Sequence, residues 1–146
     1  MIKTVFYKNL VNKLNFLIEK IKNCYGNNLK SIVIFGSAAR GDLTSTSDID
    51  VLIIISDSKL SLKKRIEEFY SKCGDEFEGH FLSPLIISQQ ESAKFHPFYL
   101  GIFENHKIIY DVDDIAKKML KMIEKLTTSG KISKKNGYWK INYEKI

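Results

Sequence analysis

The sequence predicts a single α/β (α+β) domain, residues 1–146, in which a small mixed β-sheet is flanked by helices. Segments with apolar residues three and four positions apart alternate with short β-branched runs, which is the pattern of helices and strands in one chain. A chain of 146 residues is long enough for one hydrophobic core and short for two. With 44% hydrophobic and 27% charged residues, the composition is globular and excludes a wholly disordered or fibrous chain.

The first half of the chain predicts one helix followed by two strands. The helix is marked by an apolar stripe at spacings of three and four, formed by Phe6, Leu10, Leu14, Leu17 and Ile21. Gly26 ends this helix. Residues 31–35 are β-branched and aromatic up to Gly36 and predict a buried strand. Residues 37–47 are small and polar and predict a short helical turn with a loop, and residues 48–55 predict a strand covered on both faces.

The second half predicts alternating helices and strands. A helix is indicated by Leu62, Ile66, Phe69, Tyr70 and Cys73, and a later one by Ile115, Met119, Met122, Ile123 and Leu126. Residues 80–87 predict a strand in which Pro84 favours an edge position or a bulge. Residues 88–105 predict two short helical pieces broken before Pro97, followed by a strand over 107–110. Residues 131–146 form a basic, aromatic tail, whose Tyr138 and Trp139 we expect to pack into the core.

Lysine supplies nearly all of the positive charge. The net charge is +6 and the isoelectric point is near 9.2, and the arginines are Arg40 and Arg65. This excess fits an anionic ligand such as a nucleotide, a nucleic acid or an acidic protein, and it fits a solvated lysine-rich surface equally well. No aromatic platform or recognition helix is evident, so nucleic acid is the least favoured of these partners.

The two cysteines and the N-terminal segment bear on the cellular compartment. Cys24 and Cys73 lie far apart without CxxC spacing, so we expect neither a zinc site nor a disulfide. The N-terminal residues interrupt their apolar positions with lysine and asparagine, and no apolar run approaches the length of a membrane span. We therefore expect a cytoplasmic protein that does not engage a membrane.

The stretch IFGSAARGDLTSTSDIDVLIII, residues 34–55, carries the clearest chemical pattern in the chain. Gly36 directly follows a strand, where the absence of a side chain lets a phosphate approach the backbone. Ser37 offers a hydroxyl and a backbone N–H to the same anion. Asp48 and Asp50 lie two apart at the start of the next strand, so their side chains project to the same side. Two neighbouring carboxylates repel each other unless a cation lies between them, which favours Mg²⁺ or Mn²⁺.

The motif resembles the signature of the DNA polymerase β-like nucleotidyltransferase superfamily, a Gly-Ser pair, ten residues, and then D-x-D. Here these are Gly36-Ser37, residues 38–47 and Asp48-Ile49-Asp50. The chain is most similar to the minimal nucleotidyltransferases, which are often paired with a HEPN-domain toxin. The resemblance implies that Asp48 and Asp50 are catalytic metal ligands for Mg²⁺, with ATP or another nucleoside triphosphate as substrate. It also implies transfer of a nucleoside monophosphate, with AMP expected, to a hydroxyl of a protein or small molecule.

The sequence departs from this family at one position. Active members carry a third carboxylate on a later strand, but HFLSPLII, residues 80–87, contains no Asp or Glu. Glu78, with Glu76 behind it, is the substitute we name for the missing metal ligand. Without such a carboxylate the chain is alternatively a catalytically degenerate binding module, or an antitoxin that acts by partner binding.

Two further residues are candidates for nucleotide binding. Arg40 either reaches a phosphate or pairs with Asp42. Ser47 either touches the triphosphate or orients Asp48. His80, His96 and His106 show no ligand spacing and are assigned to packing or to the surface. The oligomeric state is left open.

Overall fold

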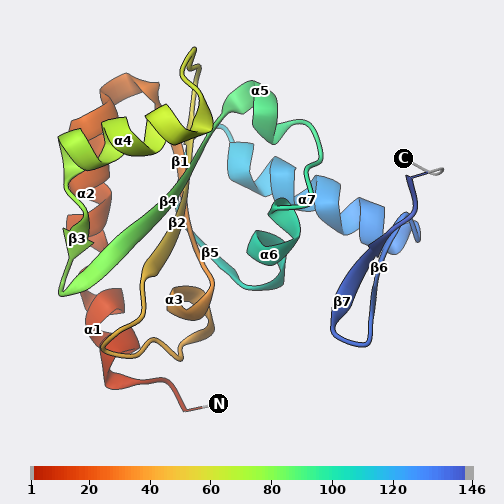
Figure 1. The fold of residues 1–146 in the computed structure, drawn as a ribbon, viewed down its shortest axis with the longest axis horizontal. Helices are drawn as coiled ribbons and strands as arrows, with labels where there is room; N and C mark the ends of the chain where they lie inside the picture. The colour runs from red at the N-terminus through yellow and green to blue at the C-terminus, as the bar shows by residue number, and fades with distance from the viewer. Residues whose placement is uncertain (1, 144–146) are drawn as a thin grey trace.

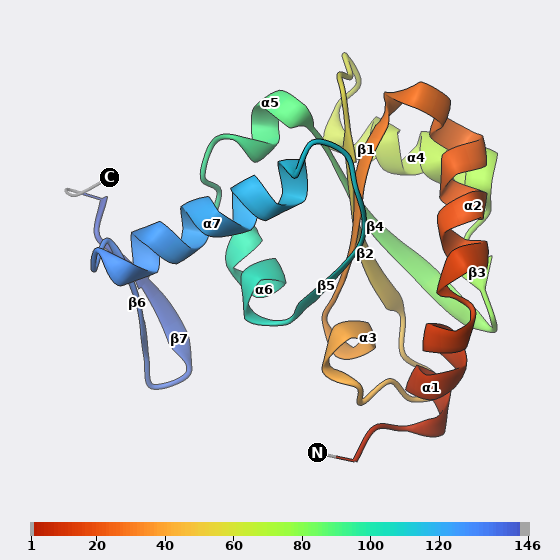
Figure 2. The same ribbon diagram turned by 180° about the vertical axis from the view of Figure 1, so that it is seen from behind.

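The computed structural model describes residues 2–143 as a five-stranded sheet with helices on both faces and a separate hairpin (Figures 1 and 2). The sheet has the order β3-β4-β2-β1-β5. Its strands are β1 (Leu29–Phe35), β2 (Ile49–Ile55), β3 (Glu76–Phe77), β4 (His80–Ser88) and β5 (His106–Asp111). The α-helices are α1 (Val5–Asn12), α2 (Leu14–Tyr25), α3 (Ser37–Arg40), α4 (Leu62–Cys73), α5 (Gln89–Ser92), α6 (Tyr99–Glu104) and α7 (Ile115–Thr128). A 3-10 turn, Gly26–Asn28, follows α2, and β6 (Ile132–Lys135) and β7 (Tyr138–Ile141) form the hairpin.

The sheet is mixed, as predicted. Strand β1 is antiparallel to β2 and β5, whereas β2 is parallel to β4. Alternation along β2 divides the core: Ile53 packs toward α1, α2 and α4, and Ile54 toward α6 and α7. Both side chains are completely buried. Among residues 2–143, every helix is too short or too polar to span a lipid bilayer.

The first predicted helix is two helices in the structure. They meet at Lys13, which has φ −114° and ψ 7°. This break resets the helical phase, so Tyr7 and Leu10 are the buried residues of α1 and Phe6 is 38% exposed. The prediction of one continuous apolar stripe that includes Phe6 is therefore wrong.

The stripe predicted for α4 is also partly wrong. Leu62 and Tyr70 are exposed, whereas Arg65 is buried. The Arg65 guanidinium can be buried because Nη1 donates to Glu91 Oε1 over 2.6 Å and to the Ile86 carbonyl over 3.1 Å. Periodicity of apolar residues cannot reveal a charged residue whose burial depends on hydrogen bonds to distant groups.

At Pro84, strand β4 is the edge of the sheet, as predicted. Pro84 pairs with Val51 of β2 on one side. On the other side β3 pairs only with residues 80 and 81, so it does not reach Pro84. A residue without a backbone N–H is tolerated at such a position because no ladder bond is lost there.

The two cysteines form a disulfide, which contradicts the prediction that they do not pair. Cys24 lies in the last turn of α2 and Cys73 is the last residue of α4, and their Cα atoms are 6.1 Å apart. The two helices cover the same face of the sheet, which brings together residues separated by 49 positions in the sequence. Spacing along the chain does not carry this information.

Candidate active site

The turn between β1 and α3 brings the backbone of Gly36 directly against the carboxylate of Asp50. Gly36 has φ +64°, and a Cβ at this position would overlap with Asp50 Oδ2. The backbone angle therefore favours glycine strongly, and a larger residue would also force the Asp50 carboxylate to move. Ser37 is the first residue of α3, so its hydroxyl and backbone N–H lie at the start of that turn. The predicted phosphate-binding turn at Gly36 and the predicted metal ligand Asp50 are thus neighbours in space.

Asp48 and Asp50 flank the first residue of β2. Asp48 is exposed, and Asp50 is half-buried. Burial, and then the nearby charge of Asp48, raise the pKa of the Asp50 carboxyl, whereas the charge of Arg40 lowers it. The two carboxylates are therefore close enough to repel each other. A divalent cation would relieve this repulsion, and carboxylate oxygens are the ligands that Mg²⁺ and Mn²⁺ prefer, so the residues fit such an ion.

The position beside Asp50 on the neighbouring strand is occupied by Ser83. In the parallel pairing of β2 with β4, Asp50 is opposite Ser83. The preceding pair shows that paired residues share a face, since Ile49 and Leu82 both belong to the core under α2, which places Asp50 and Ser83 together on the opposite face. Ser83 thus takes the place from which a third carboxylate on this strand would face Asp50. Within residues 2–143, no group of three or more His, Cys, Asp or Glu side chains could hold a metal ion.

The structure does not bring Glu78 to the aspartate pair. Glu78 is in the turn between β3 and β4, with φ 52°, and its Oε2 is 3.9 Å from Lys13 Nζ. It lines a small hollow with Phe6 and His80, beside α1. Glu76, the second substitute, is exposed in β3. Glu78 is therefore left out of the ligand set that we propose below.

Ser47 is bonded within the loop that leads to Asp48. Its hydroxyl lies 2.9 Å from both the backbone N and the Oγ1 of Thr44. His80 Nδ1 is 2.9 Å from the Ser47 carbonyl, which requires the ring to donate from that nitrogen. Earlier in the same loop, the Leu43 carbonyl accepts a hydrogen bond from Thr4 Oγ1 over 2.6 Å. These bonds hold the loop backbone that leads to Asp48, and none of them involves the Asp48 side chain.

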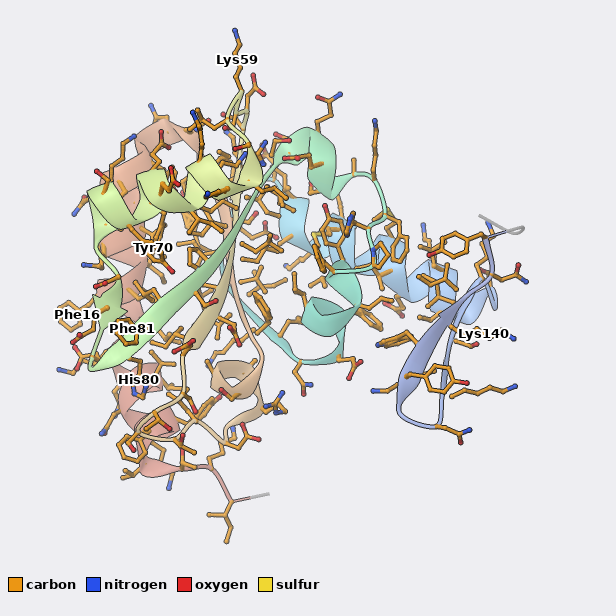
Figure 3. The ribbon with its side chains drawn as sticks, viewed as in Figure 1. Phe16, Lys59, Tyr70, His80, Phe81 and Lys140 are labelled. Atoms are coloured by element: carbon orange, nitrogen blue, oxygen red, sulfur yellow. A yellow bond between two sulfur atoms is a disulfide. The ribbon has the colours of Figure 1, made fainter. Side chains whose placement is uncertain are left out.

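His80 is a residue whose role sequence reasoning did not find. It is 6% exposed, at the start of β4, and its ring meets that of Phe6 edge-on. Figure 3 shows it at the end of β4 that lies beside α1. The contact with Ser47 joins residues 33 positions apart, and no local pattern marks it. By contrast, the Thr44–Ser47 contact follows from the Thr-Ser-Thr-Ser run, which favours side-chain turns.

Arg40 forms the predicted ion pair with Asp42. Its Nε is 3.1 Å from Asp42 Oδ2, which is an exposed ion pair. Its charge still acts on the site, because it lowers the pKa of Asp50 and also that of Glu104 at the end of α6. Arg40 is thus within electrostatic reach of both carboxylates. A phosphate bound at Gly36 would compete with Asp42 for this guanidinium.

Comparisons with known proteins agree with this geometry. The family model described as nucleotidyltransferase domain matches residues 14–134. MJ1305 of Methanocaldococcus jannaschii, assigned by name to the protein adenylyltransferases, is 32% identical over 126 residues, covering 80% of this chain and 82% of that protein. Spectinomycin 9-adenylyltransferase of Enterococcus faecalis is 30% identical over 97 residues, covering 62% of this chain and 38% of that protein.

Two solved structures share the fold. The spectinomycin adenylyltransferase crystallised with ATP and spectinomycin has a TM-score of 0.54 at 18% identity, over 73% of this chain and 58% of that one. A variant of the toxin–antitoxin complex MntA-HpeT has a TM-score of 0.50 at 16% identity, over 79% of this chain and 90% of that one. Because both identities are low, these likenesses bear on the fold alone. From the family match, the extent of the MJ1305 alignment and the Gly36–Asp50 geometry, the chain belongs to the nucleotidyltransferase domain family.

Proposed function

We propose that this nucleotidyltransferase transfers AMP from ATP to a hydroxyl group of another protein. The observation that carries the proposal is the contact between the Gly36 backbone and the Asp50 carboxylate, with Asp48 beside it. The similarity to MJ1305, which is named a protein adenylyltransferase, supports adenylate as the transferred group and a protein as the acceptor. The ATP bound to the spectinomycin enzyme supports the same nucleotide, while its antibiotic substrate makes a small-molecule acceptor the alternative.

Asp48 and Asp50 would hold Mg²⁺, which Mn²⁺ can replace. When bound, the metal supplies positive charge to the triphosphate oxygens. Gly36 lets the phosphates approach the backbone, Ser37 donates to them, and Arg40 turns from Asp42 toward the added negative charge. The acceptor oxygen forms a bond to the α-phosphorus, the bond from that phosphorus to pyrophosphate breaks, and the acceptor proton is released to solvent. Positioning and electrostatics account for most of the rate in such a reaction.

Label transfer tests this proposal directly. The protein is incubated with ATP labelled at the α-phosphate, Mg²⁺ and an extract of its source cells, and labelled proteins are separated from labelled small molecules. We expect labelled protein, and we expect Asp50→Asn to reduce labelling at least about 100-fold. Asp57→Asn, in the exposed loop after β2, is the matched control and keeps its labelling. Equal labelling by the Asp50→Asn and Asp57→Asn variants would contradict the proposal.

A second candidate function is an antitoxin that acts by binding a HEPN-type toxin without chemistry. Ser83, in the place of a third carboxylate, is the observation that favours it, and the fold shared with MntA-HpeT supports a toxin partner. The two functions differ in one readout. If the Asp48→Asn, Asp50→Asn double variant binds and suppresses the toxin as well as the natural protein does, binding alone is sufficient. Loss of suppression with binding retained supports transfer.

A further inference from the structure

The β6–β7 hairpin presents a basic outer face. Pairing of Lys135 with Tyr138, and of Ser133 with Lys140, puts these four side chains on one side of the hairpin. All four are exposed, and Tyr138 retains 57% of its accessible surface, so the expectation that Tyr138 packs into the core is wrong. Residues 131–143 contain Lys131, Lys134, Lys135 and Lys140 and no Asp or Glu. We call Ser133, Lys135, Tyr138 and Lys140 the outer hairpin face.

The inner side of the hairpin is firmly attached to the domain. Ile132 is 1% exposed, and Trp139 and Ile141 pack against the core beneath α7. Glu104, at the end of α6, accepts a hydrogen bond from Lys134 Nζ over 2.7 Å and another from Trp139 Nε1. Lys134 Nζ also lies over the Trp139 ring, 5.6 Å from its centre. The outer face is therefore presented by a fixed element.

The charge of Arg40 acts on a carboxylate at the hairpin and on one at the proposed nucleotide site. Its anchor, Glu104, has a pKa that hydrogen bonds from Lys134 and Trp139 lower, with a further contribution from Arg40. Arg40 is the same residue that acts on Asp50. In Figures 1 and 2, α6 lies between α3 and the hairpin, and the tip of the hairpin points to the end of the molecule where α3 lies. Figure 3 places Lys140 on this hairpin, across the molecule from His80.

We propose that the outer hairpin face binds an acidic segment of the protein that receives AMP. The proposal rests on the proposed function and specifies the substrate class of that same site. Charge complementarity favours an acidic partner, because Lys135 and Lys140 are positively charged and form no ion pair among residues 2–143. Tyr138 is the exposed aromatic ring of the outer hairpin face, and Tyr143, two residues after β7, is also exposed. The charge of this face lies on Lys135 and Lys140, so an acidic polypeptide is the partner we infer, and single-stranded RNA is the competing ligand in the test below.

Binding of two copolymers tests the surface without relying on chemistry. Fluorescence anisotropy measures the affinity of the full chain for labelled copolymers of glutamate with tyrosine and of lysine with tyrosine, at low and at physiological salt. We expect binding of the glutamate copolymer alone, weakened by salt. The charge reversal Lys135→Glu, Lys140→Glu is expected to weaken it at least about tenfold. The matched control, Lys63→Glu, Lys64→Glu on exposed positions of α4, changes affinity less than about twofold.

Three results would overturn the inference. They are failure of the natural protein to prefer the glutamate copolymer, equal weakening by the hairpin and α4 variants, and tighter hairpin-dependent binding of a single-stranded RNA oligonucleotide. The milder change Lys135→Gln, Lys140→Gln removes the two charges without reversing them and should weaken binding less. A titration of every variant with ATP and Mg²⁺ checks that the variant is folded and keeps its nucleotide site. Hairpin-dependent binding of the copolymer without any transfer of labelled AMP would instead count against the proposed function.

Discussion

Replacing Ser83 with aspartate would add a third carboxylate beside Asp50, on the same face of the sheet. Adjacent strands are about 4.8 Å apart, so the new charge would lie at about that distance from Asp50. Two like charges at this separation repel by about 1 kcal/mol in water and by about 3 kcal/mol at an effective dielectric of about 20. We therefore expect Ser83→Asp to lower the free energy of unfolding of the metal-free protein by about 1 to 3 kcal/mol.

Metal should reverse this loss of stability. A third carboxylate adds a ligand for a hard divalent ion, and we expect Mn²⁺ affinity to rise about tenfold. The assay is calorimetric titration with Mn²⁺, together with urea unfolding followed by fluorescence of Trp139, with and without the metal. Ser83→Asn is the control, because it has nearly the same size and no charge. Equal Mn²⁺ affinities for the Asp and Asn variants would refute the placement of Ser83 in the site.

Three further perturbations test other parts of the account. His80→Ala removes the donor to the Ser47 carbonyl, so titration with ATP and Mg²⁺ should show several-fold weaker binding of ATP. An unchanged affinity would show that His80 does not position the loop. Cys24→Ser opens a loop of 49 residues and should lower the free energy of unfolding by up to about 4 kcal/mol; a reductant should then destabilise the natural protein and leave the variant unaffected. Asp50→Asn should stabilise the metal-free protein at pH 7, because folding raises the pKa of Asp50 above its ordinary 3.8 and makes the ionised form costly. This gain in the free energy of unfolding should be absent below pH 3.8 and should grow as the pH rises from 3.8 to the raised pKa of Asp50. A gain that stays constant over this pH range would contradict the prediction.

The central part of the site could be predicted because its signals are local. A glycine after a strand and two aspartates two positions apart constrain the backbone and the side-chain direction within a few residues. At Gly36 the structure shows a positive φ, with the Asp50 carboxylate lying against the backbone where a Cβ would be. The β6–β7 hairpin was not predicted, although Asn136-Gly137 is a strong two-residue turn signal and both residues have positive φ in the structure.

The remaining features depend on contacts between distant elements. Whether Glu78 reaches the aspartates depends on the side of the sheet to which the β3–β4 turn directs it. In the structure, Glu78 pairs with Lys13 instead. The disulfide requires α2 and α4 to end side by side. The burial of Arg65 requires Glu91, which lies 26 positions later in the chain. None of these contacts produces a periodic pattern, so sequence periodicity could not reveal them.

The most direct test of the central claim is calorimetric titration with ATP, with and without Mg²⁺, on the natural protein and on the Asp48→Asn, Asp50→Asn double variant. Both proteins must first unfold cooperatively, so that a loss of binding is not due to a loss of folding. We expect Mg²⁺-dependent binding of ATP that the double variant loses. Equal binding of ATP by the two proteins would contradict it, because the nucleotide would then be held without the two carboxylates beside Gly36.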